Sequence, residues 1–256
     1  MTGRISAILV DLDGTVYSGS EPIPGAARFI AELERRDIAY LFVTNRANRG
    51  PQVVADHLVE LGIPCRAESI LTSAQATAVR LGKGRAYCLG ESGLTDALAA
   101  AGIEVVEQDP DVVVVSYDRA LTYEKLERAV RFLAAGAGFV ATNPDPVIIT
   151  ESGLSPETGS ILAAVEAASG RKAEIVGKPQ RPIIDAAVQR LGRPRGETVI
   201  LGDNLDTDIL AGHNAGLRCA LILTGISTRA EAEACDRPPD WIAEDYDELT
   251  RLLLPD

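Results

Sequence analysis

Four short stretches of this sequence hold the side chains that could do chemistry together. They are Asp11-Leu12-Asp13-Gly14-Thr15, Thr44-Asn45, Gly177-Lys178-Pro179 and the acidic stretch from Gly202 to Asp208. Carboxylates suit a hard divalent cation, whereas a lysine, a hydroxyl and amide groups suit an anion. If the fold brings the four stretches together, they could hold a cation and an anion side by side.

The first stretch follows the apolar run AILV and places Asp11 and Asp13 two residues apart, with Gly14 allowing a sharp turn. Charges at the end of a buried strand need a partner, and Mg²⁺ prefers oxygen ligands of this kind. The alternative is that both aspartates only cap a turn. The buried strand directly before them favours the metal interpretation.

The second and third stretches are suited to binding an anion. Thr44 and Asn45 follow the run YLFV and offer a hydroxyl, an amide and backbone N–H groups near a predicted helix start. Lys178, between a glycine and a proline, could act as a point charge. Each of these is common in turns and on surfaces, so neither indicates a site alone.

The fourth stretch follows the run TVIL and holds three carboxylates. Asp203, directly at the strand end, is the better candidate metal ligand. Asp206 and Asp208 are expected in the first turn of a helix through Ala215, where carboxylates complement the helix dipole.

Apolar runs alternate with amphipathic helix-length segments along the chain, which predicts an α/β fold with parallel sheets. In such sheets, ligands bind where loops converge at the carboxyl ends of the strands. Strands are expected at residues 7–10, 40–43, 86–89, 112–116, 139–142, 198–201 and 220–223, and Trp241 reads as part of a late strand or a core anchor. Helices are expected at residues 26–35, 53–61, 123–133, 159–168 and 182–191.

Two glycine-bearing segments, Leu81–Gly84 and Gly170–Gly177, are candidate seams between domains. The predicted division is a core of residues 1–82 and 176–256, with an inserted domain at residues 83–175.

The four stretches, in this order and at strand ends, resemble the haloacid dehalogenase (HAD) superfamily. The long gap between the second and third stretches, with Ala141–Asp145, is similar to the branch of NagD-type and nitrophenyl phosphatases. That resemblance implies a Rossmann-like core and a large α/β cap of the C2 type. It also implies a Mg²⁺-dependent phosphatase that forms an aspartyl-phosphate, with the cap selecting the leaving group.

The resemblance implies roles for individual residues. Asp11 matches the nucleophile, and Asp13 matches the general acid that protonates the leaving oxygen and then activates water. Mg²⁺ would be held by the carboxylates of Asp11 and Asp203 and by the backbone carbonyl of Asp13.

By the same resemblance, Thr44 and Asn45 grip the phosphoryl oxygens, and Lys178 neutralises charge on Asp11 and the phosphate. Asn204 is expected near the phosphate, where it helps to order the site. Asp208 is expected to support these residues without contacting the substrate or the metal itself.

Two features leave alternatives open. Many relatives continue the second stretch with asparagine and serine, whereas this chain has Arg46 and Ala47. Arg46 either adds positive charge near the substrate or faces solvent. Asn143 and Asp145 either shape the cap or only build a turn.

The charge balance restricts the partners. With 25 lysines and arginines against 37 aspartates and glutamates, the net charge of −12 would repel nucleic acid and anionic membranes. The apolar run near the N-terminus is too short for a signal or membrane segment, so a cytoplasmic location is expected. The expected partner is a small phosphorylated metabolite, and a homodimer through the cap is a further option.

The expected substrate is a sugar phosphate, glycerol phosphate, pyridoxal phosphate, a nucleotide or p-nitrophenyl phosphate. Haloacid dehalogenation is less favoured, because it needs neither Mg²⁺ nor an acid at Asp13. A non-catalytic phospholigand-binding or interaction protein that retains the site is the other alternative, and a rate measurement would distinguish it.

Overall fold

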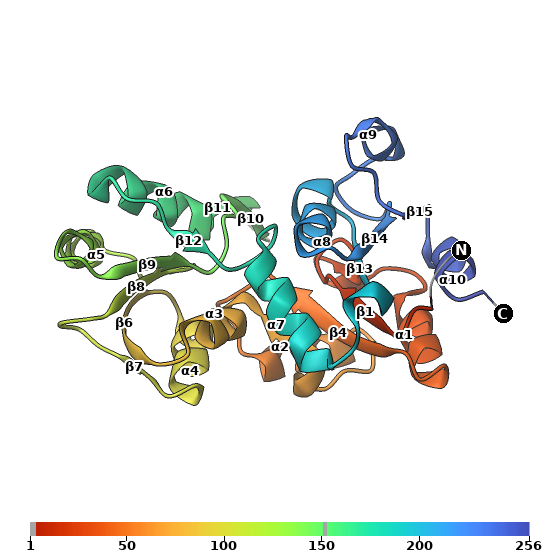
Figure 1. Ribbon diagram of the computed structural model, residues 1–256, viewed down its shortest axis with the longest axis horizontal. Coiled ribbons are helices and arrows are strands. Elements are labelled where there is room, and N and C mark those ends of the chain that lie inside the picture. Colours follow the sequence, from red (N-terminus) through yellow and green to blue (C-terminus); the bar gives the residue numbers. More distant parts are fainter. Residues whose placement is uncertain (1–3, 151–152, 256) are drawn as a thin grey trace. The chain divides into compact units, whose positions relative to one another are not determined.

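The computed structural model describes residues 4–150 and 153–255. Strands and helices alternate along the chain (Figure 1). The chain forms two compact units. The first contains the residues up to Thr44, Pro51–Leu71 and the residues from Lys178 onwards, and the second contains Asn45–Gly50 and Thr72–Gly177.

The first unit is built on a six-stranded sheet in the order β15-β14-β13-β1-β4-β5, in which β1 pairs in parallel with both β13 and β4. A short hairpin, β2–β3, follows β1. The elements are β1 (Ala7–Val10), β2 (Tyr17–Ser18), β3 (Glu21–Pro22), α1 (Ala26–Arg35), β4 (Ala39–Thr44), α2 (Pro51–Glu60), β5 (Ile70–Thr72), α7 (Arg181–Leu191), β13 (Thr198–Gly202), α8 (Leu210–Ala215), β14 (Arg218–Ile222), α9 (Arg229–Ala234), β15 (Trp241–Ala243) and α10 (Tyr246–Leu253).

The central strands of this sheet are apolar because both of their faces are covered. Every residue of β1 and β13 is buried. Ile8 and Val10 of β1 belong to one core cluster with Phe29 of α1 and Tyr246 of α10. Burial of apolar surface stabilises this packing by about 25 cal/mol per Å². It thereby fixes the positions of the strand ends that carry the polar loops.

The second unit is built on a five-stranded parallel sheet in the order β12-β9-β8-β6-β7, with a separate hairpin, β10–β11. Along β8, Val113 and Val115 pack in a cluster with residues of α5 and α6, whereas Val112 and Val114 pack with residues of α3 and α4. The elements are α3 (Ser73–Leu81), β6 (Gly84–Leu89), α4 (Ser92–Ala100), β7 (Ile103–Val105), β8 (Val112–Val115), α5 (Tyr123–Ala134), β9 (Gly138–Ala141), β10 (Val147–Thr150), β11 (Gly153–Pro156), α6 (Thr158–Ser169) and β12 (Glu174–Ile175).

The α/β fold expected from the sequence is confirmed, and every strand and helix expected above forms with ends shifted by at most two residues. The expected seam at Leu81–Gly84 joins the end of α3 to the start of β6. Helix α3 therefore lies in the second unit, and the chain passes into that unit after Leu71 instead of after residue 82. The sequence signal for α3 was the capping box of Thr72 and Gln75.

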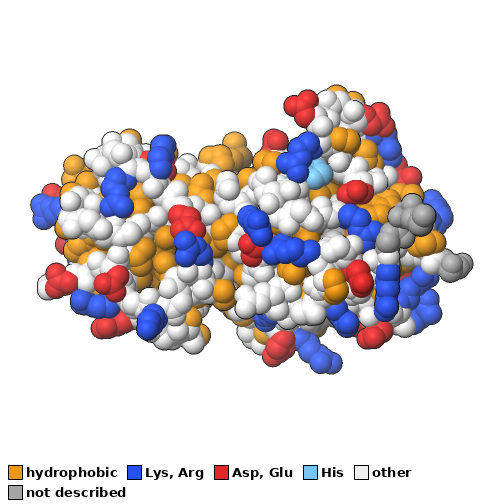
Figure 2. Space-filling model, viewed as in Figure 1, with side chains coloured by type: hydrophobic (Ala, Val, Ile, Leu, Met, Phe, Trp, Pro, Cys, Tyr) orange, Lys and Arg blue, Asp and Glu red, His pale blue; other side chains and the backbone are white. Residues whose placement is uncertain are grey.

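Acidic and basic side chains are interspersed on the face seen in Figure 2, without a large patch of one sign. Within the described residues, the helices are all too short or too polar to span a bilayer.

Candidate active site

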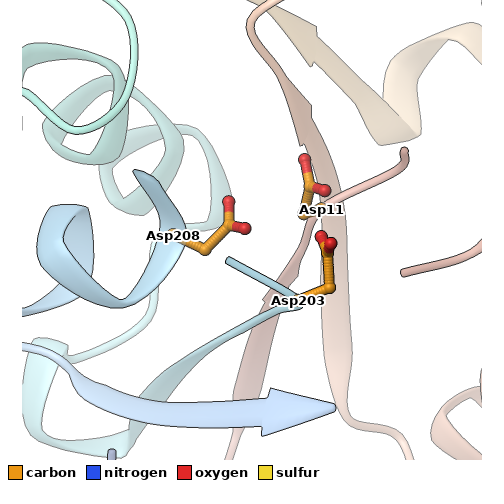
Figure 3. A group of neighbouring side chains, drawn as sticks. All are labelled: Asp11, Asp203 and Asp208. Atoms are coloured by element: carbon orange, nitrogen blue, oxygen red, sulfur yellow. The ribbon is translucent and has the colours of Figure 1, made fainter. Parts of the chain in front are cut away.

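Three carboxylates converge at the carboxyl ends of β1 and β13 (Figure 3). The two strands are parallel neighbours with Val10 opposite Leu201, so Asp11 and the residues after β13 reach the same edge of the sheet. Oxygen atoms of Asp11, Asp203 and Asp208 lie within 4.8 Å of one another, and all three residues are buried. The sequence prediction that Asp11 and Asp203 meet is therefore confirmed.

Asp208 reaches the cluster because of the turn that precedes α8. Leu205–Ile209 forms a single π-helical turn, and the Asn204 side chain caps it by accepting from the Asp206 N–H at 2.9 Å. The Asn204 N–H donates to the Asp208 carboxylate at 3.3 Å. Asn204 thus orders this loop, as expected, while a contact between Asn204 and phosphate stays a prediction. Asp208, expected behind the site, is one of the three clustered carboxylates.

Lys178 is the buried cation of this cluster, with 3% of its surface exposed. Its ammonium group donates to Asp11 and, at 2.7 Å, to Asp208, and it lies 3.3 Å from the carbonyl oxygen of Val43. Burial alone would lower the pKa of Lys178, but the two carboxylates outweigh it and hold that pKa above its ordinary value. Lys178 therefore carries its charge at neutral pH and bridges Asp11 and Asp208.

The cluster still has an excess of negative charge, because three carboxylates face one lysine. Burial, and then the charge of Asp208, raise the pKa of Asp11 well above its ordinary value. The same two causes raise the pKa of Asp203 to about 6. A divalent cation among these oxygens would favour their charged forms. The all-oxygen donor set thus fits a hard cation such as Mg²⁺.

Thr15 is a site residue that the sequence analysis missed. Its hydroxyl is fully buried, donates to Asp203 at 3.2 Å and lies 3.5 Å from the Asp11 carboxylate. The hydroxyl links the loops that follow β1 and β13. Its place four residues after Asp11, within the first polar stretch, was the available signal.

The loop after β14 was also missed, although it follows a strand end like the others. The Ile226 N–H donates to the Asp203 carboxylate at 2.8 Å, and the Thr224 hydroxyl donates to the Gly14 carbonyl at 2.7 Å. Gly225 passes so close to Asp203 that a side chain there would collide with the carboxylate. This loop therefore fixes the orientation of Asp203.

Asp13 and Thr44 lie at the same edge of the sheet but outside the carboxylate cluster. Asp13 is partly exposed, and its carboxylate accepts from the Tyr17 hydroxyl at 3.4 Å. Thr44 is the last residue of β4, the strand beside β1, and is 2% exposed. The structure thus places both residues without testing the roles that the resemblance implies for them.

Asn45 belongs to the second unit, where the Asn143–Asp145 turn holds it. Its side-chain amide donates to Asp145 at 2.9 Å, and its carbonyl accepts from the Asn143 amide at 2.9 Å. Asn143 and Asp145 do form a turn, because the Asp145 N–H donates to the Asn143 side chain. The turn also anchors the segment after Thr44, in which Arg46 is partly buried.

Glu157 lies under this turn and should make stability depend on pH. It is 6% exposed, accepts from the Thr158 N–H and lies 3.5 Å from the Asn143 amide. Burial, with a smaller contribution from Asp145, raises its pKa to about 7. The folded chain then binds more protons than the unfolded chain, so stability falls as pH rises from about 5 to 8.

We expect Glu157→Gln to remove this dependence. Relative to the variant, the wild-type chain should lose up to about 3 kcal/mol of unfolding free energy between pH 5 and pH 8. Urea unfolding at several pH values measures the difference. If the unfolding free energies of the two proteins changed with pH in parallel, Glu157 would already be charged at pH 5.

One hollow of the first unit lies away from these residues. It has a volume of about 650 Å³ and is lined by Tyr40, Cys65 and Arg66, among others, near the beginning of β4 and not its carboxyl end. None of the clustered carboxylates lines it. This hollow is therefore not the candidate active site.

The chain belongs to the haloacid dehalogenase-like hydrolases. The model of that family matches residues 8–104, and a second one, described as HAD-hydrolase-like, matches residues 175–249. The gap between them falls in the second unit.

Individual relatives identify the branch. The chain is 38% identical to 5'-nucleotidase YutF of Bacillus subtilis, over 91% of this chain and 96% of the relative. It is also 38% identical to an acid sugar phosphatase of Staphylococcus saprophyticus, over 96% and 97% of the two chains. The structure of NagD from Escherichia coli K-12 superposes with a TM-score of 0.92 at 35% identity, covering 96% of this chain and 98% of NagD.

The chain is thus a NagD-like phosphoric monoester hydrolase, as the resemblance of its polar stretches and of the long gap between them implied.

Proposed function

We propose that the chain hydrolyses small phosphomonoesters through an aspartyl-phosphate on Asp11, with Mg²⁺ as the cofactor. The observation that supports this most is the convergence of Asp11, Asp203 and Asp208 with the buried ammonium group of Lys178. A carboxylate held between a lysine and a cation site is positioned to attack an electrophilic phosphorus. Its own negative charge would otherwise repel the phosphate oxygens.

The reaction has two steps. A carboxylate oxygen of Asp11 attacks phosphorus, the ester P–O bond breaks, and Asp13 gives its proton to the leaving oxygen. Asp13 then takes a proton from water, and the water oxygen attacks phosphorus. The bond from phosphorus to Asp11 breaks, releasing inorganic phosphate and restoring the carboxylate.

Other residues position these groups. Lys178 fixes one oxygen of Asp11, and Thr44 and Asn45 hold the phosphoryl oxygens. We assign the Mg²⁺ ligands to the carboxylates of Asp11 and Asp203 and the backbone carbonyl of Asp13. Mg²⁺, when bound, neutralises charge on the phosphoryl oxygens and on Asp11. Asp208 supports this arrangement through Lys178.

The substrate is proposed from the relatives' names, which include a nucleotidase and a sugar phosphatase. We propose a small phosphorylated metabolite, with a cytoplasmic location. Selection by the second unit, acting as the cap, and a homodimer through it remain predictions.

A phosphate-release assay tests the proposal. The purified chain with Mg²⁺ should release phosphate from at least one member of a panel of sugar phosphates, nucleoside monophosphates, glycerol phosphate, pyridoxal phosphate and p-nitrophenyl phosphate. EDTA should abolish release, and added MgCl₂ should restore it. Tight binding of these esters without release would instead indicate a non-catalytic phospholigand-binding protein, and release that persists in EDTA would overturn the cofactor.

Asp13→Asn tests the proton-transfer step. With p-nitrophenyl phosphate, whose leaving group needs little protonation, the first step should survive and the hydrolysis of the intermediate should become slow. We expect a burst of nitrophenol stoichiometric with enzyme, followed by a steady rate about 10²- to 10⁴-fold below wild type. Rapid-mixing absorbance measures both phases. Undiminished steady turnover in Asp13→Asn would show that another group is the acid and base.

A further inference from the structure

Residues 45–50 follow directly after Thr44 yet are built into the second unit. Ala47 is 1% exposed and packs in a cluster with residues of α3 and α4. At the start of α4, a side chain at Gly93 would come within 2.5 Å of the Arg49 nitrogen and of the carbonyl carbon of Asn48. The segment is therefore closely packed within that unit.

Two buried side chains hold the main-chain carbonyl of Asn45. The Ser73 hydroxyl donates to it at 2.5 Å and the Asn143 amide at 2.9 Å, and both residues are 0% exposed. If the segment moved away, both donors would lose this acceptor inside the protein, which costs more than losing a bond at the surface. The Asn45 amide adds a bond to Asp145.

We infer that Asn143 and Ser73 are positioning residues for the phosphate grip, because they fix the Asn45 carbonyl next to the peptide bond that joins Thr44 to Asn45. The inference rests on the proposed function in assigning Thr44 and Asn45 to the phosphoryl group. Asn143 and Ser73 act only through Asn45 and do not touch the substrate.

Three variants test this role, namely Ser73→Ala, Asn143→Ala and the isosteric Asn143→Asp, which places an oxygen opposite the Asn45 carbonyl. Each should weaken the binding of inorganic phosphate, measured calorimetrically with Mg²⁺, and raise KM for p-nitrophenyl phosphate about tenfold. The kcat should change less than KM. Hydrogen exchange at residues 45–50 should become faster than in wild type.

Ser116→Ala is the matched control, because the Ser116 hydroxyl is also buried in the second unit but is bonded to Thr142. It should leave phosphate affinity and exchange at residues 45–50 unchanged, whatever its effect on melting temperature. Unchanged exchange in both Asn143 variants would show that Asn143 does not anchor the segment. Faster exchange with wild-type phosphate affinity would show that the anchor does not position the grip.

The wild-type protein separates failure of this inference from failure of the proposed function. If wild type binds phosphate but hydrolyses no ester, the function is wrong, and the phosphate affinities of the variants still decide the inference. If wild type hydrolyses esters but binds inorganic phosphate too weakly to measure, the function stands, and an unchanged KM for p-nitrophenyl phosphate in all three variants would overturn the inference.

Discussion

Asp11→Asn is expected to reduce phosphate release by at least about 10⁴-fold, because a neutral amide oxygen is a poor nucleophile and cannot form the aspartyl-phosphate. The fold should survive. Lys178 keeps its bond to Asp208 at 2.7 Å, and Asp203 keeps its bonds to Thr15 and Ile226. Since burial raises the pKa of Asp11, its charge is costly to the folded chain without a cation. The melting temperature in EDTA should therefore equal or exceed that of wild type.

Asp206→Asn is the matched control, because Asp206 is exposed on the loop that carries Asp203 and Asp208. Its rate of phosphate release should stay within about twofold of wild type, as is usual for surface changes. For both variants, phosphate release from p-nitrophenyl phosphate measures the rate, and thermal unfolding measures the melting temperature. Asp11→Asn turnover above about one per cent of wild type would contradict a nucleophilic role for Asp11.

Lys178→Met is expected to have the largest effect on stability. Lys178 is bonded to two buried carboxylates, and removing one partner of a buried ion pair costs about 3–5 kcal/mol. In EDTA the variant should lose about that much unfolding free energy, measured with urea. Mg²⁺ should stabilise it more than it stabilises wild type, because the cation then replaces the missing positive charge. The rate of phosphate release should also fall in Lys178→Met, since Asp11 loses the lysine that orients its carboxylate.

Lys172→Met supplies the comparison. Lys172 also pairs with a carboxylate, that of Glu166, but its side chain is 85% exposed, against 4% for Lys178. Exposed pairs contribute little, so this variant should lose less than about 1 kcal/mol. Equal losses in the two lysine variants would mean that the carboxylates around Lys178 are not charged in the folded protein.

The local pattern was sufficient for most of the regular structure. The buried run of β1 and the amphipathic spacing of α1 predicted both elements directly, because each depends on residues within a few positions. Helices α3, α4, α9 and α10 were missed. Helices α3 and α4 are rich in alanine, so their apolar and polar faces contrast little, and only the capping box of Thr72 and Gln75 indicated the start of α3.

The sequence by itself determined which strand ends carry the polar residues of the candidate site. Asp11 and Asp203 follow strands and Thr44 ends one. Parallel strands present their carboxyl ends at one edge, so the placement of these residues at one edge followed from the order of the elements.

Tertiary structure decided what each side chain faces. Packing alone placed Asp208 in the cluster, bonded Thr15 to Asp203 and carried the segment that begins at Asn45 into the second unit. Such contacts join residues distant in the chain, or depend on a turn such as Leu205–Ile209 that propensity does not specify. They arise only when strand pairing and burial fix the backbone around them.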